Sequence, residues 1–351
     1  MLVVLLATIS GTIADADLWG NVRYGQDILC AGRIPDHDPH SFTSDVPWIN
    51  HEWLTELVMA LAYAAGGTSG LVMLKVLLAC LTLGLLWRAV RAVGVFEPLA
   101  LGLLLIATLG ASYLFMTIRA QLFSALIFVV LLSTLSAAAR GRTRLLLWMP
   151  VLFCAWANLH GGWLVGLGVV GLWAGSRLLA GTLAWRWAIS VPALALAGTA
   201  VNPYGFRLWS LLWGTVGLSR PDIAEWQPLL RAPFLWLPWV IAAALVVEAW
   251  RRRGVAARAD AVPVVALGVL ALLVARLEGF FALASVILMA PALASAGPRR
   301  WPVSRRPTRA EMAAVGVFCA AAGFGFIVLF RGRPCRGGQQ NNHASSQQAF
   351  P

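Results

Sequence analysis

Long apolar runs separated by short polar segments dominate this chain. A helix that crosses the hydrocarbon core of a bilayer needs roughly 20 apolar residues, and on this basis the pattern predicts about 11 transmembrane helices. The runs are 1–14, 70–93, 97–115, 119–138, 145–159, 162–180, 186–200, 234–250, 261–276, 279–296 and 311–330. Several runs are shorter than a full span, so the pattern defines their existence better than their ends.

Two further stretches have the pattern of an amphipathic helix. In residues 52–66, EWLTELVMALAYAAG, the apolar residues recur at helical spacing along one face, and the polar residues tend to the other. Residues 17–31 show a weaker version. Helices of this kind lie in the membrane interface instead of crossing it. We therefore expect a first outer loop, residues 15–69, in which the turn-rich segment GRIPDHDPHSFTSDVPW joins two juxtamembrane helices.

Composition agrees with this pattern. The 351 residues are 60% hydrophobic and only 12% charged, with a mean hydropathy of +0.77. Soluble domains are about half apolar and about a quarter charged, so these values predict an all-α polytopic membrane protein. We expect one transmembrane domain over residues 1–330 and a disordered polar tail over 331–351. The first run lacks a basic leader, which favours a first span with a missing or misassigned start over a cleaved signal peptide.

Arginine positions orient the predicted spans. Most of the residues behind the net charge of +12 cluster in short loops. Three of these loops contain Arg140, Arg142 and Arg144; Arg251, Arg252, Arg253 and Arg258; and Arg299, Arg300, Arg305, Arg306 and Arg309. Short arginine-rich loops stay on the cytoplasmic side. Segments 15–69, 116–118, 158–162 and 201–233 then lie outside, and the positive charge needs no nucleic acid to explain it.

Titratable residues gather in the predicted outer segments. Eight of the fifteen acidic residues lie between Asp15 and Glu56. His37, His40 and His51 belong to the same loop, and His160 lies in another outer segment. Outer loops are polar in general, but a loop that only connects two spans does not need this concentration. We interpret it as a functional surface that includes His51 and Glu52.

Asp15 and Asp17 are the strongest candidates for catalytic residues in this surface, because they directly follow the first apolar run. In an extended segment, residues two apart point the same way. Partial desolvation at the bilayer edge raises a carboxyl pKa, so one aspartate could accept a proton from an acceptor hydroxyl. The other could orient the acceptor or hold a metal. The alternative is two solvated acids that end a helix.

Two outer boundaries carry further polar residues. The segment NLHGGW contains Asn158 and His160, and the segment VNPYG contains Asn202 and Tyr204. These four side chains could hydrogen-bond a sugar. The glycines and the proline in both segments also suit plain turns between helices, so a structural role for the four residues is equally consistent with the sequence.

Arg119 and Arg276 lie where predicted spans meet the outer surface. The positive-inside rule disfavours arginine there, so each needs a reason. Guanidinium groups bind phosphate through paired hydrogen bonds, and this predicts a phosphate site. Pairing with a nearby acid is the alternative, and Glu278 is close to Arg276 in sequence.

Several of these segments together resemble a known superfamily. DADLW, followed by GQDILCAGRIPDHDPHSFTSDVPWINHEWLTEL, and then ANLHGGW, VNPYG and EWQP, are similar to bacterial multispan proteins of the glycosyltransferase-C superfamily. The resemblance covers roughly residues 10 to 295 and lies near the protein O-mannosyltransferases and the lipid A aminoarabinose transferases. The string around PDHDPHSFT and HEWL is the most specific part.

The resemblance implies an inverting glycosyltransferase in the bacterial inner (cytoplasmic) membrane. Such enzymes move a sugar from a polyprenyl-phosphate carrier to an acceptor at the outer face. Asp15 would be the base or acceptor aligner, with Asp17 as the nearby alternative, and Arg276 would meet the lipid phosphate. The phosphate site predicted from the arginines themselves adds Arg119 to Arg276. Some members use a divalent metal and others do not, and the sequence leaves this open, as it does the acceptor.

Two other function classes remain open. A transporter or a non-enzymatic component of envelope assembly would carry ionisable residues deep within its spans. Lys75 is the one such residue that the sequence singles out. A polysaccharide ligase or polymerase would use the same lipid-linked donor but would attach whole chains.

Overall fold

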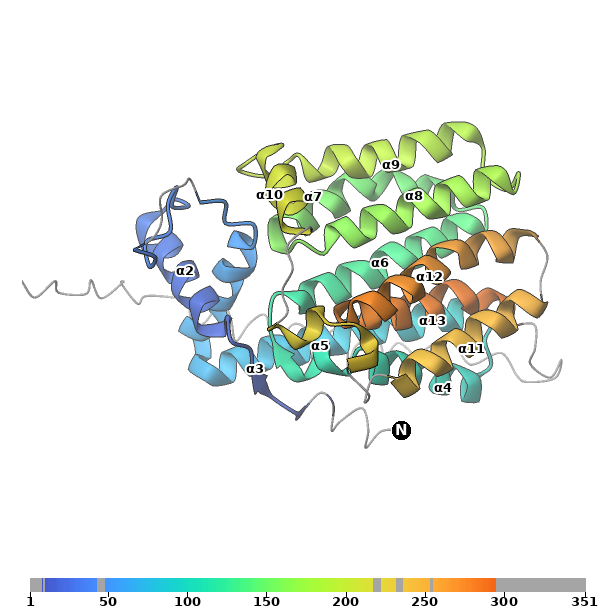
Figure 1. The fold of residues 1–351 in the computed structure, drawn as a ribbon, viewed down its shortest axis with the longest axis horizontal. Helices are drawn as coiled ribbons and strands as arrows, with labels where there is room; N and C mark the ends of the chain where they lie inside the picture. Colours follow the sequence, from blue (N-terminus) through green and yellow to red (C-terminus); the bar gives the residue numbers. More distant parts are fainter. Residues whose placement is uncertain are drawn as a thin grey trace, which may run out of the picture. The chain divides into compact units, whose positions relative to one another are not determined.

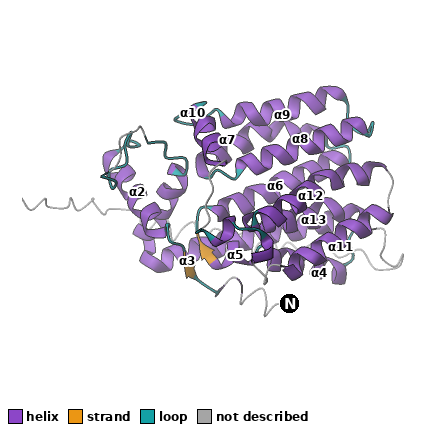
Figure 2. Cartoon of the chain, viewed as in Figure 1, coloured by secondary structure: helices purple, strands orange, loops and turns teal. Residues whose placement is uncertain are grey.

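The described part of the chain is mostly helical. The computed structural model describes residues 8, 10–42, 48–216, 222–231, 236–252 and 255–294. In these residues the remaining regular structure is one pair of two-residue strands (Figure 2). The predicted all-α class is therefore confirmed. The expected span 311–330 and the tail 331–351 lie outside the described residues, as does most of the expected span 1–14.

The two helices expected in the first outer loop are both present. Helix α2 (Leu18–Ala31) ends at Gly32, whose positive φ of 63° lets its N–H bond back to the Ile28 carbonyl. Helix α2 packs along the first part of α3 (Trp53–Ala92). The contact is close at Gly25, since a Cβ there would lie 2.0 Å from the Glu56 carbonyl oxygen. Glycine at this position is what allows the two helices to touch.

Helix α3 contains a sharp kink at a pair of glycines. Gly66 and Gly67 have non-helical backbone angles, and Gly67 has a φ of 58°. This conformation suits glycine and disfavours residues with a Cβ. The kink separates the amphipathic start of α3 from its apolar remainder, which is where the sequence separates residues 52–66 from 70–93. The predicted boundary is thus a bend within one element.

The segment that follows α2 is held by aromatic and acidic side chains. The Tyr24 hydroxyl on α2 donates a hydrogen bond to Asp38 Oδ1 at 2.9 Å. Its ring also packs on Trp48, with the centroids 4.8 Å apart. The His40 imidazole lies 2.7 Å from Asp27 Oδ2. These contacts hold residues 33–42 and Trp48 near α2, and no helix or strand is present among the described residues between α2 and α3.

The remaining helices form a bundle whose long axes run side by side (Figure 1). The elements are α4 (Glu97–Gly110), α5 (Ser112–Met116), α6 (Gln121–Ala139), η1 (Thr143–Trp148), α7 (Met149–Leu159), α8 (Trp163–Leu179), α9 (Trp185–Thr199), α10 (Arg207–Val216), η2 (Ala224–Trp226), η3 (Leu229–Arg231), α11 (Trp236–Arg252), α12 (Val255–Leu273), η5 (Ala275–Leu277) and α13 (Glu278–Ala294). Helix α13 packs against α4, α6, α11 and α12, and nearly all of its residues are buried. It forms the centre of the bundle.

One end of the bundle carries the arginine-rich connections. Arg140 follows α6, Arg177 lies in the last turn of α8, and Arg258 lies in the first turns of α12. Asp260 joins these ends, because its carboxylate accepts 2.7 Å and 3.0 Å hydrogen bonds from Arg177 and interacts electrostatically with Arg140. Two of the three arginine-rich connections that the sequence assigns to the cytoplasmic side, after α6 and before α12, therefore share one end of the fold, and the third, at 299–309, lies outside the described residues.

Among the described residues, three helices are long and apolar enough to cross a membrane: Trp53–Ala92, Gln121–Ala139 and Ala275–Ala294. Three shorter apolar helices, Glu97–Gly110, Thr143–Leu159 and Trp163–Leu179, fall below that length. The expected number of about 11 spans is therefore wrong for the described part of the chain. Several apolar runs break earlier than expected; the run 97–115, for example, breaks after Gly110, where a Cβ would lie 2.4 Å from the Ala282 methyl group.

Candidate functional site

A short parallel ladder brings the N-terminal segment to the bundle. Strand β1 (Ile13–Ala14) pairs with β2 (Thr117–Ile118), with Ile13 opposite Thr117 and Ala14 opposite Ile118. Lys75 supports this segment from α3 by donating to the Gly11 carbonyl and to Thr12 Oγ1. The residue after each strand is consequently also aligned with its neighbour. Those residues are Asp15 and Arg119.

Asp15 and Arg119 form an ion pair at the end of this ladder. Asp15 Oδ2 lies 3.3 Å from Arg119 Nε, and the two side chains are only 12% and 7% exposed. Asp15 Oδ1 accepts the backbone N–H of Asp17 at 3.1 Å. Residues 15–17 thus form a turn that starts α2, and Asp17 is exposed there. The sequence had suggested an extended segment with both aspartates pointing one way, and the structure differs because this turn separates them.

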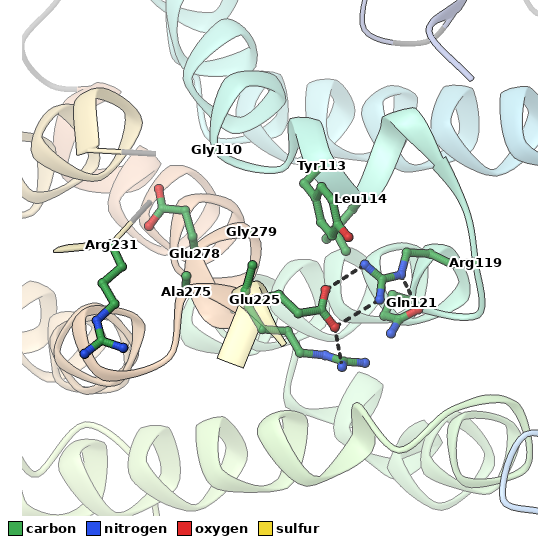
Figure 3. A pocket seen from close by; sticks show the side chains of 12 residues that line it. Gly110, Tyr113, Leu114, Arg119, Gln121, Glu225, Arg231, Ala275, Glu278 and Gly279 are labelled. Carbon is green, nitrogen blue, oxygen red and sulfur yellow. Dashed lines mark hydrogen bonds and ion pairs between the residues drawn. The ribbon is translucent and has the colours of Figure 1, made fainter. Parts of the chain in front are cut away.

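Glu225 is the partner of Arg119 that the sequence did not assign. Arg119 donates from Nη1 and Nη2 to the two oxygens of Glu225, at 2.8 Å and 3.1 Å, and from Nε to Gln121 Oε1 at 2.8 Å. Tyr113 lies against the guanidinium, which is 5.0 Å from its ring centroid. Figure 3 shows this paired, two-pronged contact between Arg119 and Glu225.

The same carboxylate also holds Arg276. Arg276 Nη1 donates to Glu225 Oε1 at 2.6 Å, and its guanidinium lies 5.3 Å from the Trp226 ring centroid. The break between α12 and α13 positions Arg276, since the Ala275 N–H bonds the Gln227 carbonyl and ties η5 to the segment after η2. Two arginines that are far apart in sequence therefore bind the same acidic residue. Glu278, which the sequence offered as an alternative partner for Arg276, is not paired with it.

A cavity of about 160 Å³ lies beside these arginines. Its lining residues come from the end of α4, from α5, from the start of α6, and from the segments around η2, η3 and η5. They are Gly110, Tyr113, Leu114, Arg119, Gln121, Ala224, Glu225, Arg231, Ala275, Arg276, Glu278 and Gly279. Neither carboxylate oxygen of the buried Glu278 has a hydrogen-bond partner among the described residues. The cavity thus combines three arginines with two carboxylates in mostly apolar walls.

Glu52 and His160 form a second part of the site. Glu52 Oε1 lies 3.5 Å from His160 Nε2 and 3.5 Å from His51 Nε2. Burial raises the pKa of Glu52 from its usual 4.5 to about 7, partly offset by the positive charges of Arg276 and Arg119. The same residue is affected by the negative charges of Asp17 and Asp15. Glu52 therefore shares the electrostatic environment of the Asp15–Arg119–Glu225–Arg276 network.

Hydrogen-bonding groups at Nδ1, the ring nitrogen that does not face Glu52, fix the orientation of His160. The Gly162 N–H donates to His160 Nδ1 at 2.9 Å, and Ser124 Oγ lies 2.7 Å from the same nitrogen. Trp156 Nε1 donates to Ser124 Oγ at 2.7 Å, so the serine hydroxyl hydrogen is directed to Nδ1. Burial lowers the pKa of His160 well below its usual value, and the ring is neutral at pH 7. Its proton then belongs on Nε2, facing Glu52.

The other predicted sugar-binding residues use their polar groups within the chain. Asn158 accepts a hydrogen bond from Trp53 Nε1 and donates to the Cys154 and Val201 carbonyls. Asn202 closes the turn that contains Tyr204, whose hydroxyl accepts the Asn50 N–H at 3.1 Å. Asn158, Asn202 and Tyr204 thus join α3, α7 and the turn after α9. Their role in sugar binding stays a prediction.

Of the predicted site residues, the structure brings together Asp15, Arg119, Arg276, Glu52, His51 and His160, while Asp17 lies at the edge. Glu225, Gln121 and Ser124 are additional members. Among the described residues there is no group of three or more histidine, cysteine, aspartate or glutamate side chains arranged to hold a metal. The cluster is therefore defined by carboxylates and guanidinium groups.

Comparisons with known proteins add no family to this description. A scan against models of known protein families gives no match, and a search of curated proteins gives none. Any functional conclusion therefore depends on the sequence resemblance and on the geometry of this cluster.

Proposed function

We propose that this chain is an inverting glycosyltransferase of the bacterial inner membrane, a multi-pass protein that takes a sugar from a polyprenyl-phosphate carrier. The observation that carries the proposal is the meeting of Arg119 and Arg276 beside a cavity, with Asp15 and Glu52 in the same cluster. A transfer of this kind needs cationic groups for the leaving phosphate and a carboxylate for the attacking hydroxyl. The cluster offers both.

The arginines suit a lipid phosphate in position as well as in charge. They lie at the end of the bundle opposite the Arg140, Arg177 and Arg258 connections. Under the positive-inside rule, that end faces away from the cytoplasm. Arg276 also belongs to a segment, Ala275–Ala294, that is long and apolar enough to span a bilayer. A phosphate at the bilayer edge would reach it while the prenyl chain stays in lipid.

Glu225 would hold the two guanidinium groups in place before the donor arrives. Its carboxylate engages both arginines in the way that a phosphate engages a pair of guanidinium groups. Donor binding would transfer part of this interaction from Glu225 to the phosphate. The developing charge on the leaving phosphate would then be stabilised by groups that are already oriented, which avoids reorganisation during the reaction.

The proposal is tested with the full chain in lipid nanodiscs. Radiolabelled polyprenyl-phosphate hexoses and pentoses are supplied as donors, with envelope extract from a deletion strain as the source of acceptor. Transfer by the native chain is expected to fall at least about 100-fold in Arg276→Gln, because charge stabilisation of the leaving group is lost. Arg144→Gln, at an exposed arginine of the opposite end, is the control. Absence of transfer from every donor would reject the proposal.

A transporter is the second candidate, and a specific observation favours it. Glu278 and Lys75 are both fully buried in helices that are long and apolar enough to span a membrane. Buried ionisable groups within spans mark substrate or proton pathways in transporters. Flux of a polyprenyl-phosphate sugar across vesicles that contain only this protein, without any transfer product, would support this candidate over the first.

A further inference from the structure

Four carboxylates, those of Asp15, Asp17, Glu52 and Glu278, are candidates for the proton acceptor in the proposed transfer, and their surroundings differ. Asp15 has both oxygens engaged, one with Arg119 and the other with the Asp17 N–H. Asp17 is exposed at the start of α2. Glu52 is 19% exposed, and no hydrogen bond to its carboxylate is present among the described residues. Both contacts of Glu52 are made by Oε1, so its Oε2 has no partner among the described residues, whereas each oxygen of Asp15 has one. Glu278 also has no hydrogen-bond partner among those residues, but it is 1% exposed and so less accessible than Glu52. Glu52 thus combines a free carboxylate oxygen with access for a hydroxyl group.

We infer that Glu52 is the catalytic base of this site and that His160 is its positioning residue. The inference rests on the proposed function and names a group within it. Glu52 Oε1 lies 3.5 Å from His160 Nε2, which carries the imidazole proton because Gly162 and Ser124 direct hydrogens to the other nitrogen. The imidazole therefore faces Glu52 as a neutral donor. It can orient the carboxylate without removing its capacity to accept a proton.

The proposed transfer needs only the acceptor, the donor and the side chains of this cluster. The acceptor hydroxyl oxygen forms a bond to the anomeric carbon of the sugar as its proton passes to Glu52. The bond between that carbon and the phosphate oxygen breaks, and the phosphate keeps the electron pair. Arg119 and Arg276 stabilise the resulting charge. Glu52 then releases the proton to water.

The inference assigns Asp15 a positioning role. Its carboxylate holds Arg119 through the end of the β1–β2 ladder. Removal of the Asp15 charge should therefore weaken phosphate binding, whereas removal of the Glu52 carboxylate should slow the chemical step. The two roles give different kinetic signatures, because a lost binding contact raises KM and a lost proton acceptor lowers kcat.

Several charged and titratable groups set the pH at which Glu52 can act. Those that interact with it are Arg276, Arg119, Asp17, Asp15, His51, His160 and Glu56. With these groups in place, burial brings the pKa of Glu52 to about 7. A base works in its deprotonated form, so kcat is expected to rise with pH through about 7.

The test compares Glu52→Gln, Glu52→Asp, Asp15→Asn and His160→Gln in the full chain, with the exposed Asp36→Asn as control. Each protein in nanodiscs is assayed for sugar transfer from pH 5 to 9 and for binding of decaprenyl phosphate. Glu52→Gln should lose kcat by about 10²- to 10⁴-fold, the range for general base catalysis, with unchanged binding of the lipid phosphate. Glu52→Asp should keep a pH-dependent residual rate, and His160→Gln should shift the midpoint of the pH profile.

Two results would overturn the inference in different ways. Transfer by Glu52→Gln within about twofold of the native rate, together with loss of kcat in Asp15→Asn, would return the role of base to Asp15 and leave the proposed function intact. Absence of transfer by the native chain would reject the proposed function and the inference with it. If Glu52→Gln fails to fold, the Glu52→Asp profile decides: a rate that does not depend on pH near 7 would contradict the assignment.

Discussion

Asp15 and Arg119 are aligned by the backbone, because each is the residue that follows its strand in the β1–β2 pair. Their side chains meet at 3.3 Å, although 104 positions separate Asp15 from Arg119 in the sequence. The pairing of the two strands therefore places Asp15 opposite Arg119 before any ligand is present.

Replacement of Asp15 with Asn should destabilise the folded chain modestly. Arg119 would lose one of its two carboxylate partners but keep Glu225. The expected loss is about 1–2 kcal/mol, between the values for exposed and for fully buried ion pairs. Thermal unfolding in a fixed detergent measures it, with the exposed Asp36→Asn as reference. Equal unfolding temperatures for the two variants would show that the pair contributes no stability.

Replacement of Glu225 with Gln should separate the two functions of that residue. Without this charge, Arg276 loses its carboxylate partner and Arg119 keeps only Asp15, so the ligand-free protein should unfold at a lower temperature. Decaprenyl phosphate should then bind more tightly, by about tenfold, because the competing carboxylate is gone, and it should restore much of the lost stability. Weaker binding than in the native chain would mean that Glu225 supports the ligand and does not compete with it.

Replacement of Gly162 with Ala should disturb the support behind His160. A Cβ at this position would lie 2.4 Å from Ser124 Oγ and 3.0 Å from His160 Nδ1. We expect a loss of about 1–3 kcal/mol from overpacking and a shift in the pH profile of transfer.

Gly171→Ala is the matched control for this change, since it lies within α8 and a Cβ there would meet nothing within 4 Å. Alanine in a helix interior is favoured over glycine, so this variant should be stabilised by about 0.5–1 kcal/mol. An equal response of the two variants would argue against a specific role for Gly162.

The stability of the protein should depend on pH through Glu52. The folded chain raises the pKa of this group from 4.5 to about 7. Between these values the folded state holds a proton that the unfolded state has released, so stability is fully present below pH 4.5 and falls as the pH rises through about 7. Glu52→Gln cannot lose this proton, so its free energy of unfolding should not show this fall. The difference in free energy of unfolding between Glu52→Gln and the native chain should therefore grow by roughly 3 kcal/mol from pH 4.5 to pH 8.

Unfolding curves of both proteins at several pH values in one detergent would measure that difference. The same variant at pH 4.5 serves as its own control, because the native Glu52 is protonated there in the folded state. An advantage of Glu52→Gln that stays constant from pH 4.5 to pH 8 would contradict the raised pKa.

The apolar periodicity predicted much of the helical structure but overestimated the number of spans. The amphipathic stretches 17–31 and 52–66 are helical as expected, because their polar and apolar faces are distinct. Span counting failed because the pattern records an apolar run but not where the backbone within it leaves the helical conformation. Ala111 is an example, since its φ of −100° and ψ of 14° separate α4 from α5 inside the apolar run 97–115.

The sequence likewise predicted some residues of the candidate site but not their partners. Asp15, Arg119 and Arg276 stood out because charged residues are unusual at the edges of apolar runs. The partners of these arginines could not be predicted, since Glu225 lies in an irregular segment whose position depends on η5. Ser124 and Trp156 also could not be singled out, because both lie within apolar runs and become polar partners only when α6 and α7 meet.

The β1–β2 ladder has only two residues in each strand, and this limits how firmly the first acidic residue is held. Each backbone hydrogen bond contributes about 1 kcal/mol net, so detaching this segment costs far less than unfolding the helices around α13. The donations from Lys75 to Gly11 and Thr12 add a second, side-chain anchor. Detachment of the N-terminal strand is therefore expected to cost less free energy than unfolding those helices, and it would take Asp15 away from Arg119.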